Sequence, residues 1–382
     1  MRIAYATTWD PLDIRSWSGT SCYMAQAIKN ESISLDFIGP LKKRHALQAY
    51  IKSAYYHGLI RKRYLRNRGP SILKGYAGQI ALRLSKISPD IVFSPGTIPI
   101  AYLDCAQPIV IWTDSVFAGM IDFYPEFSNL CGESVINGNA MERSALERCA
   151  LAVYSSDWAA RTAINNYNVP PGKVKVIPFG ANLDCRRTLD DIKYMVSSRP
   201  AKICKLLFLG VDWFRKGGDT AVKVAKELND SGLRAELTIA GCRPPGPFPG
   251  YVNALGRIDK SSEEGRTRID KLLSESHFLI LPSRADCFPI VFPEANSFGV
   301  PCISTDVGGI STAIKDGLNG RLFPKDAGIS EYCGYIQGVF RDPDRYRELA
   351  LSSFHEYESR LNWKESIGIL KQYLQDLPLR GS

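Results

Sequence analysis

The sequence has 382 residues, with 48 Lys and Arg against 39 Asp and Glu, so its formal net charge is +9. This length allows two or three domains with a core each, and a content of 45% hydrophobic and 23% charged residues excludes disordered, collagen-like and disulfide-scaffold proteins. No apolar run reaches the roughly 18 residues that a membrane-spanning helix needs. We therefore expect a cytoplasmic protein that is at most peripheral on the inner face of a membrane.

Short apolar runs alternate with helical segments along the whole chain, and we expect each run to be a strand. The expected strands are residues 2–7, 34–39, 90–95, 109–112, 151–156, 174–179, 205–210, 235–241, 252–256, 277–283, 301–306 and 320–323. Continuous apolar runs of this kind are typical of parallel strands covered on both faces. The sequence thus predicts an α/β fold of two doubly wound parallel-sheet domains, residues 1–185 and 186–362, divided in a polar stretch near 183–202.

The loop after the first strand ends at Gly19, and a helix is expected from Ser21 to Lys29. Glycine lets a ligand approach the backbone closely, and the free N–H groups of a helix start suit a phosphate. A dinucleotide dehydrogenase is poorly supported because the loop contains no G-x-G-x-x-G. An ordinary turn explains a single glycine before a helix equally well.

The positive charge is concentrated between residues 41 and 89, which contain 12 Lys and Arg and no Asp or Glu. Outside this basic segment 36 basic residues face 39 acidic ones, so the rest of the chain is slightly acidic. Leu47, Ile51, Tyr55 and Leu59 recur at helical spacing, and a basic helix that carries aromatic residues suits an anionic membrane surface. A solvated helix face with a core-facing stripe fits about as well. Nucleic acid is not expected as a partner, because the segment contains no recognisable nucleic-acid module.

Two loops of the second half carry charges directly after an expected strand. Arg215 and Lys216 follow the strand that ends at Gly210, and Asp219 is a candidate cap of the next helix. Such a pair of cations can neutralise a diphosphate, although a plain surface turn explains the loop as well.

The other loop places Asp286 in a turn and Glu294 beside a helix start, where a carboxylate is favoured by the helix dipole. Two carboxylates at this spacing can bind different hydroxyls of one polyol ligand. The alternative reading is a turn residue at Asp286 and a helix-dipole partner at Glu294.

Cysteine and histidine are not arranged as metal ligands. Ten cysteines are scattered singly, only four histidines occur, and there is no C-x-x-C. We expect free thiols, no metal and no cofactor.

In this order, these loops resemble those of the retaining glycosyltransferases of family 4, which have the GT-B fold of two Rossmann-like domains facing a central cleft. The resemblance is strongest from Lys205 to Pro324, and its most specific part is the carboxylate pair Asp286 and Glu294. It also includes the stretches 299–301, 305–309 and 316–320, an interdomain segment at 177–182, and a terminal helix of about 363–382 that crosses back to the first domain.

The resemblance implies a role for each matching residue. Asp286 and the backbone of Cys287, Phe288 and Pro289 would hold the donor sugar, and Glu294 would bind the ribose of the nucleotide. Arg215 and Lys216 would bind the diphosphate, and Gly19 the phosphate or acceptor side. The implied reaction is a same-face displacement at the anomeric carbon that requires no metal, with a UDP- or GDP-linked sugar as the donor.

The sequence departs from the family pattern near the donor site. The first carboxylate is Asp286 where Glu is usual, and Cys287-Phe288-Pro289 replaces G-F-G. Val211 stands where the family has a phosphate-binding Arg, which Arg215 is expected to replace. Asp114 stands near the usual position of a His and is a candidate for a polar role at the donor sugar, or else a buried structural residue.

We therefore expect a retaining glycosyltransferase with a sugar or lipid-linked acceptor, whose first domain docks on an anionic membrane surface through residues 41–89. The catalytic candidates are Asp286, Arg215, Lys216 and Asp114. Two alternatives stay open: a non-catalytic nucleotide-sugar or glycan-binding protein on the same fold, and a nucleotide-sugar epimerase.

Overall fold

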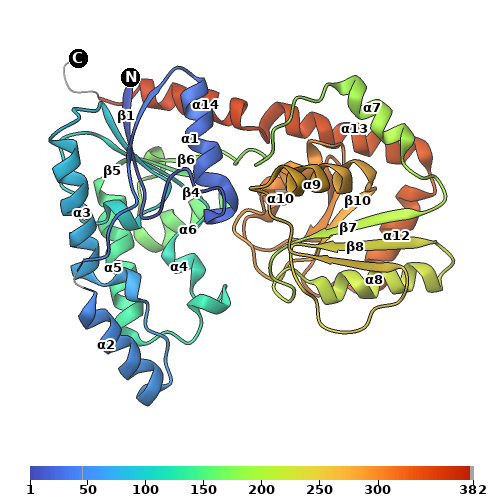
Figure 1. Cartoon of the computed structure of the whole chain (residues 1–382), viewed down its shortest axis with the longest axis horizontal. Coiled ribbons are helices and arrows are strands. Elements are labelled where there is room, and N and C mark those ends of the chain that lie inside the picture. Colours follow the sequence, from blue (N-terminus) through green and yellow to red (C-terminus); the bar gives the residue numbers. More distant parts are fainter. Residues whose placement is uncertain (45, 379–382) are drawn as a thin grey trace. The chain divides into compact units, whose positions relative to one another are not determined.

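The protein is described by a computed structural model that covers residues 1–44 and 46–378. The chain divides into two compact units (Figure 1): unit 1 is Met1–Ile177 with Ile367–Ser382, and unit 2 is Pro178–Ser366. The sequence places the boundary at 185/186. A terminal helix, α14 (Trp363–Gln375), lies where a helix is predicted over about 363–382, and residues 379–382 of that prediction lie outside the described residues.

Unit 1 contains a sheet of six parallel strands in the order β2-β1-β3-β4-β5-β6. Its strands are β1 (Arg2–Ala6), β2 (Ser34–Ile38), β3 (Ile91–Ser94), β4 (Ile109–Thr113), β5 (Cys149–Tyr154) and β6 (Val174–Val176). Its other helices are α1 (Thr20–Asn30), α2 (Leu47–Tyr55), α3 (Pro70–Leu84), α4 (Phe117–Met120), α5 (Gly132–Arg148) and α6 (Asp157–Tyr167). Short helical turns join them: η1 (Ser16–Gly19), η2 (Tyr56–Ile60), η3 (Arg66–Arg68), η4 (Ile98–Ile100), η5 (Pro125–Phe127) and η6 (Pro171–Lys173).

Helices cover both faces of the unit 1 sheet. Ala4 and Ala6 of β1 belong to the core cluster that α3, α5 and α6 complete on one face. Tyr5 points to the opposite face, where its hydroxyl donates to the backbone oxygen of Ser21 on α1 at 2.9 Å. This two-sided cover explains why the strands are continuously apolar. The terminal segment also packs in unit 1, since Lys371 Nζ lies 3.1 Å from Glu31 Oε2.

Unit 2 repeats the architecture with six parallel strands in the order β12-β11-β10-β7-β8-β9. The strands are β7 (Cys204–Leu209), β8 (Ala235–Ala240), β9 (Val252–Gly256), β10 (Phe278–Leu281), β11 (Cys302–Thr305) and β12 (Gly320–Phe323). The helices are α7 (Leu189–Ser198), α8 (Gly218–Asp230), α9 (Glu263–Glu275), α10 (Val291–Asn296), α11 (Ile310–Ala313), α12 (Ile329–Phe340) and α13 (Pro343–Arg360).

Every predicted strand is present, with ends that shift by a few residues. All ten cysteines are free, and seven of them are buried. Within the described part of the chain no helix is long and apolar enough to cross a membrane.

Each sheet has one place where the strand order reverses direction. In unit 1 the reversal lies between β1 and β3, and in unit 2 between β7 and β10. Loops that follow such strands diverge to opposite sides of the sheet and leave a crevice at its carboxyl edge, where α/β proteins bind ligands. The candidate ligand-binding loops are therefore those after β1, β3, β7 and β10.

Candidate functional site

The loops after β7 and β10 meet in unit 2. Gly217 directly follows the two candidate cations and has a φ of +75°, a conformation that favours glycine. A Cβ at this position would lie 2.0 Å from the backbone oxygen of Pro282, so only glycine allows the β7 loop to pack on the β10 loop. The backbone N–H of Arg284 donates to the oxygen of Arg215 at 2.7 Å and links the loops further.

Both predicted cations lie at Asp286. Lys216 Nζ donates a hydrogen bond to Asp286 Oδ2, and Arg215 Nη1 lies 3.7 Å from the same oxygen. Arg215 Nη1 also donates to the backbone oxygen of Ala285 at 2.9 Å. Burial lowers the pKa of Lys216, with Asp286 acting in the opposite direction. The structure therefore assembles two cations and one carboxylate at the crevice, with Lys216 and Asp286 buried and Arg215 half-buried.

The backbone around Asp286 is held on both sides. Its carbonyl oxygen accepts from the N–H of Gly309 at 3.1 Å, in the loop after β11. Cys287, Phe288 and Pro289 are buried, and the Phe288 ring lies 5.6 Å from that of Phe179. This loop is fixed by packing before any ligand binds.

Glu294 on α10 is fully buried and has a partner that the sequence did not indicate. Lys260, in the loop between β9 and α9, donates to both Glu294 oxygens at 2.6 Å. Burial raises the pKa of Glu294, and the Lys260 ammonium opposes this rise. Lys260 lies two residues before Ser262, whose side chain caps α9. Nothing in the sequence around Lys260 indicates that it pairs with Glu294.

One local expectation in this loop is wrong. Asp219 does not cap α8, because Gly217 is the cap residue and no side chain bonds there. Asp219 instead accepts two hydrogen bonds from Arg284, at 2.8 and 2.7 Å. A bidentate bond to a guanidinium is stronger than a cap to the backbone, which explains the outcome.

The other two predicted residues lie in unit 1. Gly19 is buried and directly precedes α1. Its φ of +82° lies in the region that favours glycine, so another residue there would be strained. Asp114 follows β4, where its Oδ2 accepts from the indole of Trp17 at 3.2 Å and its Oδ1 from Ser115 at 3.2 Å. Asp114 is thus part of a polar network at the carboxyl edge of the sheet.

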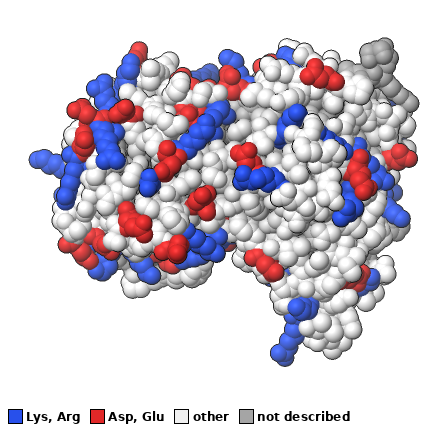
Figure 2. Space-filling view, turned by 180° about the vertical axis from the view of Figure 1, so that it is seen from behind, with Lys and Arg blue, Asp and Glu red and all other residues white. Residues whose placement is uncertain are grey.

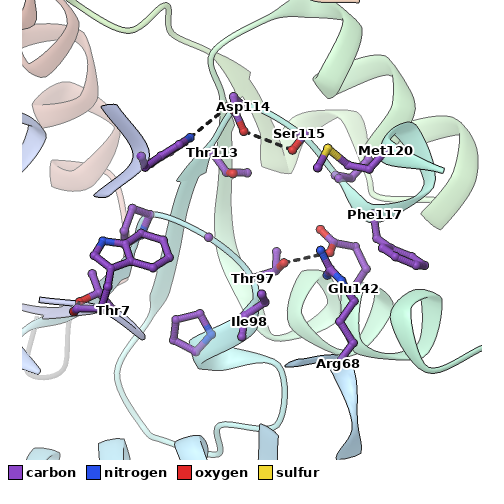
Figure 3. Close-up of a pocket in the computed structure, with 16 residues that line it drawn as sticks. Thr7, Arg68, Thr97, Ile98, Thr113, Asp114, Ser115, Phe117, Met120 and Glu142 are labelled. Carbon is purple, nitrogen blue, oxygen red and sulfur yellow. Dashed lines mark hydrogen bonds between the residues drawn. The ribbon is translucent and has the colours of Figure 1, made fainter. Parts of the chain in front are cut away.

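Asp114 lines a pocket of about 240 Å³ at the strand-order reversal of unit 1 (Figure 3). The walls come from the loops after β1, β3 and β4, with contributions from η3 and α5. Figure 3 shows Asp114 and Ser115 on one side of the opening and Thr97, Glu142 and Arg68 on the other. The sequence does not single out Glu142, which lies on α5, and it gives Arg68 only as one of the 12 cations between residues 41 and 89.

Glu142 is buried with one oxygen left over. Its Oε2 accepts from the Thr97 hydroxyl at 2.9 Å, whereas Oε1 is buried without a hydrogen-bond partner among the described residues. Burial raises the pKa of Glu142 to about 7, although Arg68 acts in the opposite direction. Arg68 Nη1 contacts the Met141 sulfur at 3.6 Å, and the guanidinium lies 4.6 Å from the Phe117 ring.

The structure brings Arg215 and Lys216 to Asp286 in unit 2, and the buried residues Cys287, Phe288 and Pro289 continue the same loop. Glu294 is buried on α10 and pairs with Lys260 instead. The structure places Gly19 and Asp114 in unit 1. Among the described residues no group of three or more His, Cys, Asp or Glu is placed to hold a metal ion.

Comparison with known proteins gives a family-model match for part of the chain. Residues 204–342 match the family model described as Glycosyl transferases group 1. The matched segment lies in unit 2, covers less than half of the chain, and includes every site candidate of unit 2.

Curated relatives match at low identity. A D-inositol 3-phosphate glycosyltransferase of Nocardiopsis dassonvillei is 25% identical over 234 residues, 56% of this chain and 53% of the relative. An alpha-D-kanosaminyltransferase of Streptomyces kanamyceticus is 24% identical over 220 residues, 55% of this chain and 56% of the relative. The chain thus spans about half the length of the curated relatives it matches.

Solved structures match over the whole chain. Sucrose-phosphate synthase from Thermosynechococcus elongatus has a TM-score of 0.68 at 16% identity, with 98% of both chains covered. Anabaena HepE, solved in complex with UDP and glucose, has a TM-score of 0.65 at 14% identity and covers 99% of this chain and 100% of its own. Identity this low shows the fold alone, and it confirms the predicted GT-B fold.

Proposed function

We propose that the protein is a retaining glycosyltransferase that moves a sugar from a UDP- or GDP-linked donor to an acceptor hydroxyl. The observation that carries the proposal is the buried group of Arg215, Lys216 and Asp286 at the strand-order reversal of unit 2. It lies inside the segment that matches Glycosyl transferases group 1. A relative named for glycosyl transfer and a neighbour solved with UDP and glucose support the same class of reaction.

In the proposed reaction the protein mainly stabilises charge on the leaving group and does not rely on proton transfer. Negative charge builds on the nucleoside diphosphate as the bond to the anomeric carbon breaks, and Arg215 and Lys216 would stabilise it at the leaving oxygens. Without a donor, Asp286 pairs with the Lys216 ammonium and opposes the lowering of the Lys216 pKa by burial. A bound diphosphate would take over that pairing and leave Asp286 to accept from sugar hydroxyls. Glu294, held by Lys260, would accept from the ribose hydroxyls. No metal or cofactor enters the proposed reaction.

The central test is donor turnover by the purified chain with UDP- and GDP-sugars. Lys216→Met should lower kcat/KM by about 10²–10³-fold, the usual loss for one group that stabilises a developing oxyanion. Lys226→Met is the matched control, since Lys226 lies on α8 with its side chain 65% exposed. Equal turnover by both variants would contradict the proposal.

Three readouts test the finer points. Nuclear magnetic resonance of the fresh product should show the anomeric configuration of the donor, and chelation of metals should leave turnover unchanged. Nucleotide-sugar binding without turnover would favour the non-catalytic alternative. A new sugar nucleotide formed from the donor alone would favour the epimerase.

The acceptor proposal rests on a surface at α2 and η2. Six large apolar side chains are exposed there: Leu47, Tyr50, Ile51, Tyr55, Leu59 and Ile60. Leu47 is 76% exposed and Leu59 is 74% exposed, so the regularly spaced apolar side chains do not face the core. In Figure 1 α2 lies at the end of unit 1 that is remote from the sheet.

Cations flank this α2–η2 surface. Of the 12 basic residues between 41 and 89, Lys52 and Arg68 are half-buried and the others are exposed, including Arg61, Lys62 and Arg63 beside η2. On the face in Figure 2 basic and acidic residues are interspersed, so no field of one sign covers that face. An anionic lipid surface would match both features, because apolar side chains enter the interface while Lys and Arg contact head groups. We therefore propose a lipid-linked or membrane-proximal acceptor.

Co-sedimentation with vesicles tests this part separately from turnover. Binding to vesicles that contain phosphatidylglycerol should exceed binding to pure phosphatidylcholine and should weaken as salt rises. Leu47→Ser with Leu59→Ser should reduce binding, whereas Leu82→Ser, at a 62% exposed position on α3, should not. Absent or salt-independent binding would exclude the membrane proposal and leave the donor chemistry untouched.

A further inference from the structure

A pocket of about 340 Å³ lies in unit 2 between the helices α12 and α13 (Figure 1) and the turn that precedes β12. Gly317 and Leu318 of this turn come shortly before β12, Val339 is near the end of α12, and Arg345 is near the start of α13. This α12–α13 pocket is therefore at the amino edge of the sheet. Asp286 lies at the carboxyl edge, where parallel sheets bind their principal ligand. The proposed transfer reaction thus leaves the pocket without a role.

Two arginines from different elements line the α12–α13 pocket. A Cβ on Gly338 of α12 would lie 3.7 Å from Arg345 Nη1, so the Arg345 guanidinium is placed against the neighbouring helix. This guanidinium has no hydrogen-bond acceptor or ion-pair partner among the described residues. Arg321 is partly engaged, since its Nη1 donates to Asp316 Oδ2 at 2.5 Å and its guanidinium lies 5.9 Å from the Tyr335 ring. The pocket therefore contains guanidinium N–H donors that the protein itself does not use.

A tyrosine hydroxyl and one carboxylate complete the polar lining. Burial raises the pKa of Tyr335 to about 12, helped by Asp316 and opposed by Arg345 and Arg321. The hydroxyl therefore stays protonated at neutral pH, with both cations close enough to act on it. Glu348 is exposed on α13 and has no ion-pair partner in the described part of the chain.

These groups match a phosphate ester of a polyol. A guanidinium binds phosphate oxygens through two parallel N–H bonds, and the Tyr335 hydroxyl can donate a further one. Glu348 would repel a second anionic group but suits a hydroxyl, which disfavours a polyanion. Leu318 and Leu349 add apolar surface for C–H groups, and about 340 Å³ is enough for one monosaccharide.

We propose that the α12–α13 pocket binds the phosphate monoester of a small polyol, such as a hexose phosphate, with Arg345 as the main phosphate ligand. Arg321 contributes through the N–H groups that Asp316 does not use, and Glu348 accepts from a hydroxyl of the ligand. The inference concerns a second ligand site of unit 2 and does not depend on the proposed glycosyl transfer.

The test is calorimetric titration of the full chain with glucose 6-phosphate, mannose 6-phosphate, inorganic phosphate and glucose. At least one hexose phosphate should bind saturably, and the same hexose without phosphate should bind about tenfold more weakly or worse. A second titration contains excess UDP, which would occupy the diphosphate position at Arg215 and Lys216. Binding of the hexose phosphate should persist there. Both titrations use the unaltered protein and stay decisive if a variant fails to fold.

Arg345→Met should weaken hexose phosphate binding by about tenfold or more, the usual loss for hydrogen bonds to a charged group. Arg347→Met is the matched control, because Arg347 is an exposed arginine of the same helix outside the pocket lining. Glu348→Gln should weaken binding of the hexose phosphate and leave inorganic phosphate at least as tightly bound, since the carboxylate accepts only from the sugar.

Three results would overturn the inference: no saturable binding of either hexose phosphate, equal affinities of the Arg345→Met and Arg347→Met chains, or a hexose that binds as tightly as its phosphate. Loss of hexose phosphate binding in excess UDP would place the ligand in the donor site and would also overturn it. Hexose phosphate binding without any sugar transfer would overturn the proposed function alone.

Discussion

In unit 2 each buried carboxylate of the candidate donor site is hydrogen-bonded by a lysine, Asp286 by Lys216 and Glu294 by Lys260. In unit 1 Glu142 is bonded by the Thr97 hydroxyl, and its Oε1 has no hydrogen-bond partner among the described residues. Both sites lie at a reversal of strand order in a parallel sheet. The two units thus have the same kind of crevice, and they differ in the charged side chains that line it. A carboxylate that is hydrogen-bonded to a lysine can exchange that partner for a ligand, whereas Glu142, near Arg68 but not hydrogen-bonded to it, is held by a neutral hydroxyl.

The strongest test of this difference between the units is to remove the lysine that pairs with a buried carboxylate. Lys216→Met leaves Asp286 buried without its hydrogen-bonded cation, and such changes cost about 3–5 kcal/mol of unfolding free energy. We expect the lower end, because Arg215 Nη1 remains 3.7 Å from Asp286 Oδ2. Urea unfolding at pH 7 measures the loss. A cost near zero would mean that the pair does not stabilise unit 2.

The buried carboxylate of Glu142 should make the unfolding free energy depend on pH. Burial raises the pKa of Glu142 to about 7 from an ordinary value of 4.5, so the folded state binds more protons than the unfolded state between these pH values. Unfolding free energy should therefore fall as pH rises from 4.5 to 7, by about 3 kcal/mol. Glu142→Gln should abolish this fall. If the unfolding free energies of the unaltered chain and of Glu142→Gln changed in parallel with pH, the raised pKa of Glu142 would be contradicted.

The buried His277 of unit 2 should make the unfolding free energy change with pH in the opposite direction. Burial lowers the pKa of His277 to about 3, and its Nδ1 accepts from the Lys205 N–H at 3.0 Å. The folded state then binds fewer protons below pH 6.5, and stability should fall by roughly 2.5 kcal/mol between pH 6.5 and 4.5. His277→Asn keeps an acceptor without the titration. The difference between the two unfolding free energies, measured at both pH values, isolates this effect from the carboxylates.

The smallest effect is expected at the α2–η2 surface. Leu47→Ser and Leu59→Ser each remove an apolar side chain that is already exposed, so unfolding free energy should change by less than about 0.5 kcal/mol. Thermal unfolding without lipid measures this. A clear destabilisation would place these side chains in the fold rather than in a docking surface.

The sequence predicts the strands well because a strand covered on both faces is apolar at every position, as in Ile109–Thr113. It also identifies the unit 2 loop residues, since charges and glycines follow the strand ends directly. It does not reveal Lys260 or Glu142, whose partners come from elements distant in the chain. Periodicity in α2 indicates one apolar face, but whether that face is covered depends on tertiary structure, and Leu47 is exposed.

Unit 1 consists of two separate segments of the chain, and unit 2 of one continuous segment. During synthesis, residues 178–366 therefore become available as a complete folding unit while unit 1 still lacks Ile367–Ser382. Domains fold as units when their residues are available. Unit 2 can thus be complete before unit 1, although unit 1 begins earlier in the chain.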